Sequence, residues 1–261
     1  MQRHLIPRHA LWLLLVIATA MTLLGGCAHS TFGTRTPLDV SGPVSVDIAT
    51  FGGDVTIRST GDAPGQAYVL VRPEATHSVH RMTDAQTSLE DIDWSIETVE
   101  EDGHTTIRIR GTTLYPESGL QRLHVTIATP YIDGVRARTR LGDVDVLDVD
   151  GPIDIDTTRG DVSIVTDRSL HGPITAMTTD GDITIRAAPG TRGRLDGFTA
   201  KGRVICSVPD GKLRVHGRSG DQTLQGVIND GDEPFTLRTN DGTIRVVVKQ
   251  YPYQQSSFLY D

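Results

Sequence analysis

Acidic side chains are the most concentrated chemical feature of this 261-residue chain. Between Leu141 and Val165 seven aspartates stand against one arginine, whereas between Arg192 and Arg218 seven basic residues stand against two aspartates. Carboxylates gathered in this way can hold a divalent cation, and opposite charge at two ends of a region can draw molecules together end to end. The alternative is that the aspartates are turn residues and the charges line solvated strand faces, which is the interpretation that we favour.

Three aspartates follow a glycine at the same place in successive units of a repeat, namely Asp143, Asp161 and Asp182. Equivalent residues of stacked strands lie roughly 5 Å apart, so these carboxylates repel one another unless something relieves the charge. Backbone N–H groups of a turn would relieve it, and so would a bridging divalent cation. Because Gly-Asp also stands alone at Asp54, we favour the turn role. The sequence therefore predicts a structural ladder without a bound metal or cofactor, and these three aspartates are the candidate ligands if a cation binds.

Two further aspartates, Asp154 and Asp156, are two residues apart and are predicted to point outward from one strand. Paired carboxylates on one outer face are what a polysaccharide-active β-helix enzyme would use. Against catalysis, carbohydrate sites usually carry aromatic platforms, and both tryptophans lie outside the repeat. The sequence also lacks Gly-x-Ser-x-Gly, His-Glu-x-x-His and phosphate-cradling glycine loops. We therefore predict no catalytic residues and keep Asp154 and Asp156 as candidate binding residues.

The two cysteines have separate roles and form no disulfide framework. Residues 1–26 combine a basic start with a 15-residue apolar run, which is short for a membrane span and typical of a signal peptide. The run ends in Leu-Gly-Gly-Cys, which resembles the bacterial lipobox. The resemblance implies cleavage before Cys27 and acylation of this residue with fatty acids such as palmitate. Ala28 rather than aspartate follows, which implies the outer membrane in a cell with two membranes. Residues 27–41 are then expected to be a linker, whereas Cys206 falls on an inward-facing strand position and is expected to behave as a small apolar residue.

The formal net charge of −8 at pH 7 argues against nucleic acid as a partner, because phosphate binding needs a basic face. The partners that we expect are therefore the membrane of a bacterial cell envelope, through the lipid anchor, and a glycan or protein of that envelope.

Regular elements must position these residues, and the glycine spacing predicts them. The segments TTRGDVSI, TTDGDITI and TAKGRVIC begin at Thr157, Thr178 and Thr199, one every 21 residues. After eight glycines of this region, the second and fourth residues are apolar at 15 of 16 positions, so short strands bury one face. Each glycine would mark a corner where the next strand begins. The pattern predicts an all-β protein with a β-solenoid, similar to a parallel β-helix, over 131–249.

The preceding residues, 42–130, are predicted to form an N-terminal β region with one inserted helix at about 75–91, where apolar residues recur at helical spacing. Alternating apolar residues on both sides of Asp102-Gly103 predict a hairpin. The aromatic tail, 250–261, is expected to cover the open end of the solenoid, since an uncovered edge invites further strand pairing.

A strand that ends in Thr-Pro at Pro130, a short strand at Val135–Ala137 and the Thr-Arg-Leu-Gly-Asp-Val run from Thr139 resemble the bacterial adhesin-like β-strand-repeat family DUF4097. The resemblance extends over 42–248 and includes the helix-then-hairpin insert at 74–110. It implies a β-strand-repeat fold and brings no catalytic residues with it. We therefore predict a non-enzymatic, lipid-anchored module of the cell envelope that serves adhesion, binding or structural support. The alternative is a polysaccharide-active or polysaccharide-binding β-helix protein that uses outward aspartates.

Overall fold

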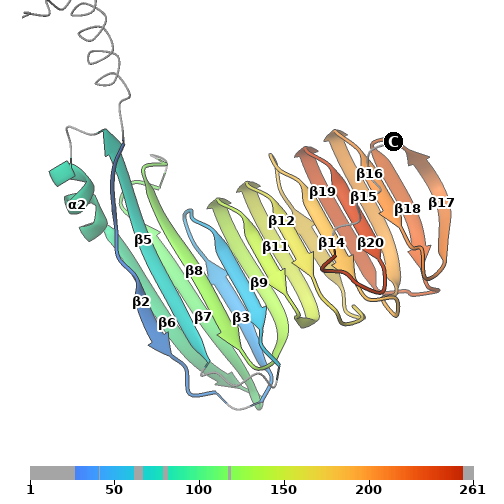
Figure 1. The fold of residues 1–261 in the computed structure, drawn as a ribbon, viewed down its shortest axis with the longest axis horizontal. Helices are drawn as coiled ribbons and strands as arrows, with labels where there is room; N and C mark the ends of the chain where they lie inside the picture. Colours follow the sequence, from blue (N-terminus) through green and yellow to red (C-terminus); the bar gives the residue numbers. More distant parts are fainter. Residues whose placement is uncertain (1–26, 41, 62–66, 79–81, 117–118, 255–261) are drawn as a thin grey trace, which may run out of the picture.

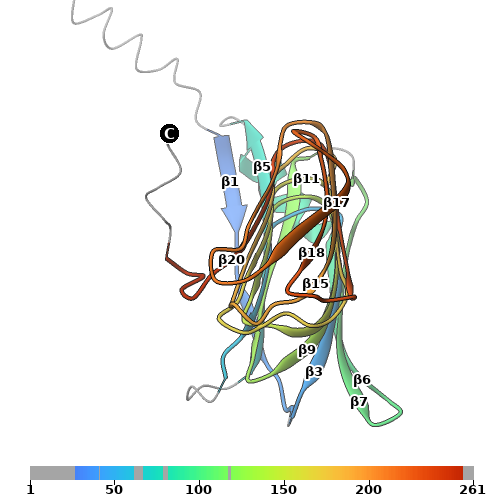
Figure 2. The ribbon, with the colours of Figure 1, turned by 90° about the vertical axis from the view of Figure 1, so that its right-hand side faces the viewer.

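The computed structural model describes residues 27–40, 42–61, 67–78, 82–116 and 119–254. The predicted signal peptide lies outside these ranges. The strands form two ten-stranded sheets, here called sheet A and sheet B, which extend along one long rod (Figure 1). Viewed along the rod, the two sheets face each other as two walls (Figure 2).

In spatial order, sheet A consists of β1 (Cys27–Thr31), β5 (Tyr68–Ser78), β8 (Gln121–Thr129), β4 (Val55–Ser59), β10 (Val144–Leu147), β12 (Val162–Val165), β14 (Ile183–Ala187), β20 (Ile244–Val248) and β16 (Val204–Ser207), with β2 (Thr34–Pro37) also paired to β5. Sheet B consists of β17 (Leu213–Gly220), β18 (Thr223–Ile228), β15 (Gly193–Lys201), β19 (Pro234–Asp241), β13 (Ile174–Met177), β11 (Asp150–Arg159), β9 (Ile132–Leu141), β3 (Val44–Ala49), β7 (His104–Thr113) and β6 (Ile92–Glu101). One helix, α2 (Met82–Glu90), lies against β5 and β1.

Successive strands of the repeat alternate between the two sheets, and each pair forms one coil. Neighbouring coils are parallel and in register, so Val144 pairs with Val162 and Val162 pairs with Ile183. The aliphatic side chains therefore stack into continuous rows between the sheets. Of the 15 apolar positions expected inside, all are buried except half-buried Cys206 and Leu213 and exposed Val215. The predicted all-β solenoid is confirmed.

The last coils do not stack in the order of the chain. The 21-residue spacing predicts that the coil of Thr199 lies on the coil of Thr178, but β19 separates β13 from β15 and β20 separates β14 from β16. The inserted coil contains Thr239-Asn-Asp-Gly-Thr-Ile, which has the same residue pattern but does not follow the 21-residue step. The hairpin of β17 and β18 then continues sheet B beyond β15, which explains why Val215 lies outside the core.

The boundary expected at residue 130 is not a break in the sheets. Strand β4 pairs with β10, and β3 pairs with β9, so residues 44–59 already form a coil of the solenoid. Their Gly, Asp and alternating aliphatic residues follow the later repeat, which accounts for the direct stacking. The hairpin predicted at Asp102-Gly103 is confirmed, since both residues have positive φ and join β6 to β7.

Two local expectations for the N-terminal half are wrong. A linker is expected over 27–41, but in its described part, 27–40, β1 and β2 both pair with β5 and Leu38 is buried in the core. The 11-residue strand β5 is long enough to offer both strands an edge. The helix begins at Met82 instead of about residue 75, because Glu74 and Ala75 continue β5 beside β8. No helix in the described ranges is long and apolar enough to span a membrane.

The described part of the C-terminal tail does not cover the end of the solenoid. Tyr253 donates a hydrogen bond of 3.4 Å to the carbonyl of Val165, on β12 in the middle of sheet A. The reason is the inserted coil, since the tail leaves β20 from inside the stack. The remaining tail residues, 255–261, lie outside the described ranges.

Candidate functional site

Threonine, glycine and aspartate meet at one corner of each coil, and the three candidate cation ligands, Asp143, Asp161 and Asp182, lie at this corner. The threonines, all buried, donate to a glycine carbonyl of the adjacent coil: Thr139 to Gly53, Thr157 to Gly142, Thr178 to Gly160, Thr239 to Gly181 and Thr199 to Gly242. These bonds are 2.9–3.5 Å long. They follow the spatial order of the coils rather than the order of the chain.

The corner glycines are required by the closeness of the stacking. A Cβ atom on Gly160 would lie 2.1 Å from the carbonyl oxygen of Gly142, and one on Gly181 would lie 2.1 Å from that of Gly160. Both residues also have positive φ, +141° and +156°, which L-residues with a side chain rarely adopt. Any other residue would therefore force the two coils apart.

The aspartates after these glycines form a ladder of carboxylates that accept backbone N–H groups. Asp54 accepts from Asp143 at 3.1 Å, Asp143 from Asp161 at 2.8 Å and Asp161 from Asp182 at 2.8 Å. Asp182 completes the series by accepting from the N–H of Thr243 at 2.6 Å. The structure thus brings the three candidate ligands together and adds Asp54, which the sequence placed alone. Because each carboxylate accepts its neighbour's N–H group, these hydrogen bonds offset part of the repulsion between the aspartates. Within the described ranges no group of three or more His, Cys, Asp or Glu residues could hold a metal ion.

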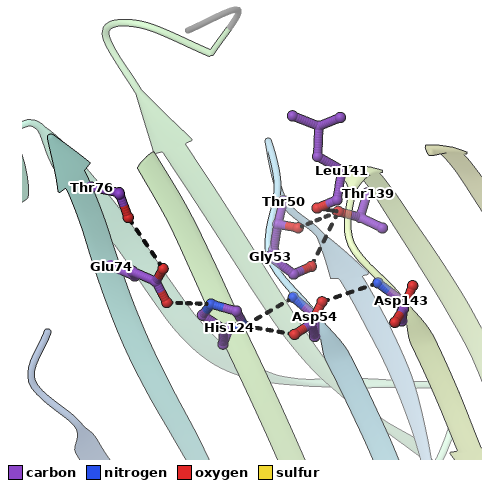
Figure 3. Close-up of polar contacts among 9 residues, drawn as sticks. All are labelled: Thr50, Gly53, Asp54, Glu74, Thr76, His124, Thr139, Leu141 and Asp143. Atoms are coloured by element: carbon purple, nitrogen blue, oxygen red, sulfur yellow. Dashed lines mark hydrogen bonds and ion pairs between the residues drawn. The ribbon is translucent and has the colours of Figure 1, made fainter. Parts of the chain in front are cut away.

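His124 lies beside Asp54, at the end of the ladder (Figure 3). No motif in the sequence pointed to this residue. Its Nδ1 lies 3.1 Å from the backbone nitrogen of Asp54, and its Nε2 lies 3.0 Å from Oε2 of Glu74. A histidine oriented by a carboxylate is also part of nucleophilic catalytic sites, but there the second nitrogen faces a nucleophile. Here it faces a backbone N–H group and the carboxylate of Asp54. The arrangement closes the end of the ladder.

Asp145 lies near this ladder on the outer side of sheet A. Burial raises its pKa above 3.8, the hydroxyl of Ser163 lowers it, and the carboxylates of Asp143, Asp54 and Asp161 raise it further.

Asp154 and Asp156 point outward from β11, as predicted, but they take part in ion pairs across sheet B. Asp154 lies 2.6 Å from a terminal nitrogen of Arg138 and 3.4 Å from Nε of Arg136, and Asp156 lies 4.0 Å from Nε of Arg138. Arg110 and Asp47 make the same kind of pair at 2.5 Å on the neighbouring strands β7 and β3. These carboxylates therefore belong to a lattice of cross-strand ion pairs instead of forming two free acids that face a substrate.

A second feature of sheet B was not predicted. Met177, Arg238 and Phe198 occupy one outward row on β13, β19 and β15, and this row is here called the outer patch. Met177 is 39% exposed and Phe198 is 41% exposed, while the Arg238 guanidinium between them is held by the carboxylate and the backbone carbonyl of Asp196. The sequence could not show the patch, because only the inserted coil brings Arg238 between the other two residues.

The cysteines occupy different settings. Cys27 is the first residue of β1 and pairs with Ser78 at the end of β5. Burial raises the pKa of Cys206 to about 12, so at neutral pH its thiol stays protonated and unreactive.

Comparison with known proteins agrees with this architecture. The sequence matches the family described as Toastrack DUF4097 over residues 43–247. The chain belongs to this family. The Toastrack match includes every complete coil and the excursions at both ends of the rod. No curated protein matches the chain.

A solved structure also shares the fold of this Toastrack protein. A candidate cell adhesion protein from Clostridium sporogenes superposes with a TM-score of 0.56 at 11% identity, over 84% of this chain and 99% of that one. A candidate adhesin from Bacteroides fragilis matches 83% of this chain and 97% of that one, at 12% identity and a TM-score of 0.28. At such low identity the likeness to the first structure shows the fold alone.

Proposed function

We propose that this protein is a non-enzymatic, lipid-anchored module of the bacterial cell envelope that binds an envelope protein through the outer patch of sheet B. The observation that carries the proposal is the composition and exposure of that patch. Met177, Phe198 and a fixed arginine between them are the residue types that concentrate binding energy in protein interfaces.

The rigidity of the patch supports this proposal. Arg238 donates to the carbonyl of Asp196 at 2.6 Å and to that of Leu237 at 3.0 Å, so a partner need not order this long side chain on binding. The three side chains lie on paired strands, which keeps them roughly 5 Å apart across the sheet. The similar structure from Clostridium sporogenes is that of a candidate cell adhesion protein, which points in the same direction.

The position of Cys27 supports the lipid anchor. Because β1 begins at this residue and pairs with β5, acyl chains on Cys27 would hold the rod at the membrane without an intervening flexible segment. In a cell with two membranes we propose the outer membrane, on the ground of Ala28. The test is to replace Cys27 by serine (Cys27→Ser) and follow membrane fractionation. Release into the soluble fraction supports the anchor, and unchanged partition contradicts it.

The polysaccharide-active alternative is less well supported, because the two candidate acids are engaged by Arg136 and Arg138. The experiment on the outer patch separates the two functions. A photoreactive amino acid placed at position 198 should form a discrete protein adduct in intact cells, whereas the same amino acid at Thr184, on the outer face of sheet A, should not.

Two results would contradict the protein-binding proposal. One is the absence of a protein adduct at position 198 beyond the level at position 184. The other is an adduct of heterogeneous mass that resists protease and is removed by glycan cleavage, which would favour a glycan partner instead. Met177→Ala should weaken the expected adduct without changing the melting temperature by more than a few degrees, because its side chain is partly exposed.

A further inference from the structure

Two arginines on the outer face of sheet A have no anionic partner among the described residues. Arg186 lies on β14 and Arg245 on β20, and they are diagonal neighbours, since Arg245 pairs with Thr184 and Arg186 pairs with Val247. The Nε atom of each is buried and has no hydrogen-bond partner within the described ranges. In the described part of the chain neither guanidinium takes part in an ion pair.

This arrangement contrasts with sheet B, where Arg110, Arg138 and Arg238 each contact an aspartate. The outward residues of β14, β20 and β16 are Thr184, Arg186, Arg245, Val247, Ile205 and Ser207. The charges among them are both positive. Like charges on neighbouring strands repel, so the pair costs free energy in the unliganded protein and a bound anion would recover it.

The neighbours of the two arginines strengthen their interaction with an anion. Arg186 lies between Val165 and Val247 in its outward row, and Arg245 lies between Thr184 and Ile205. Three of these four neighbours are apolar; they cover the side-chain stems and shield the buried Nε atoms from water, which lowers the local dielectric constant. An anion can reach the terminal nitrogens of both side chains, because both residues are only half-buried.

An aromatic ring borders the pair. Tyr253 is 49% exposed, and its hydroxyl contacts the carboxylate of Asp148 and the carbonyl of Val165, the residue that pairs with Arg186. A tyrosine ring with one accessible face presents a flat apolar surface beside a polar one. A sugar ring that carries an anionic group matches both surfaces.

We propose that Arg186 and Arg245 bind a phosphate group carried on an envelope glycan, with the ring of Tyr253 against the adjoining sugar. Two guanidinium groups can offer several N–H donors to phosphate oxygens, which a single lysine cannot match. The site lies on the sheet opposite the outer patch, so it is independent of the proposed protein-binding function.

The test measures ligand binding by calorimetry on residues 27–261 with Cys27→Ser, which retain every described strand. Inorganic phosphate should bind to this protein, and glucose 6-phosphate should bind several-fold more tightly. Glucose alone should show no binding. Either Arg186→Gln or Arg245→Gln should weaken phosphate binding about tenfold or more, since each removes a charged hydrogen-bond donor. Tyr253→Ala should remove the advantage of glucose 6-phosphate and leave inorganic phosphate unaffected.

The matched control is Arg58→Gln, which removes the same charge from the outer face of β4 on the same sheet. Arg186→Lys keeps the charge and guards against loss of folding, and it should still weaken binding because it lacks the fork of donors. Equal weakening by Arg58→Gln would overturn the proposal. So would equal affinity for glucose 6-phosphate and inorganic phosphate, or binding to phosphatidylglycerol vesicles that exceeds binding to the sugar phosphate.

Discussion

At each stacked corner of the solenoid, a glycine leaves room for the carbonyl group of the adjacent coil. Gly160→Ala would place a methyl group 2.1 Å from the oxygen of Gly142, and backbone atoms cannot move aside as a flexible side chain can. We expect this substitution to lower the free energy of unfolding by roughly 2–4 kcal/mol, measured by denaturant titration. Gly220→Ala is the control, because nothing lies within 4 Å of its Cβ position. Equal effects of the two substitutions would contradict the role given to the corner.

The raised pKa of Asp145 makes stability depend on pH. Since its pKa is higher in the folded protein than 3.8, its ionised form disfavours the folded state at pH 7, and this penalty disappears as the pH falls through the raised pKa towards 3.8. Asp145→Asn should therefore raise the melting temperature at pH 7 and lose this advantage in acid. Asp93→Asn, at an exposed site on β6, should change the melting temperature little at either pH. A gain for Asp145→Asn that is the same at both pH values would contradict this account.

Residue roles were predictable where the repeat itself carried the signal. The Gly-Asp corners indicated a turn role for Asp143, Asp161 and Asp182, and the structure shows how their charges are accommodated. The sequence pattern leaves Asp54 outside the ladder, because its neighbour in space, Asp143, is far away in the sequence. The contact of His124 with Glu74 joins residues 50 positions apart on antiparallel strands, and no local spacing reports it.

The order of the strands is the feature of the fold that sequence spacing predicts wrongly. A cysteine pair tests it directly, because residues on adjacent strands are close enough for a disulfide, whereas residues two strands apart, at about 10 Å, are too distant. Thr175→Cys with Thr236→Cys should crosslink on oxidation, since the two positions pair across β13 and β19. The measurement is gel mobility of the protein with Cys27→Ser.

The matched control is Thr175→Cys with Asp196→Cys, which would be partners if β15 lay on β13 as the 21-residue spacing predicts. In the structure β19 separates them, so this pair should not crosslink. The reverse outcome would restore the sequential order.

At the level of elements, alternation of apolar residues predicted the coils and Asp102-Gly103 predicted the hairpin. The helix and the linker were placed wrongly for one shared reason. Both Ala75 and residues 27–37 pair with neighbouring strands of sheet A, and local patterns do not contain such long-range pairing.

The whole molecule is a rod in which both ends depart from the simple repeat. At one end, β5 to β8 extend the two sheets beyond the coil of β3 and β4, and the chain then returns to that coil at β9. At the other end, β17 and β18 extend sheet B beyond β15, and the chain then returns to form the inserted strand β19. The corner ladders continue through the inserted coil, because Thr239 and Thr243 bond to Gly181 and Asp182. The repeat pattern therefore determines which coils can stack, while the chain order does not.

The central claim is that these ladders hold the coils together by hydrogen bonds, without a bound cation. It is tested most directly by thermal melts of the protein with Cys27→Ser in millimolar calcium and in chelator, for the otherwise unchanged chain and for Asp161→Asn. We predict the same melting temperature in calcium and in chelator at equal ionic strength, with a modest rise on adding any salt as the carboxylates are screened. Asp161→Asn should melt close to the parent protein, because the amide oxygen can still accept the N–H of Asp182. A large rise specific to calcium, abolished by Asp161→Asn, would contradict the claim.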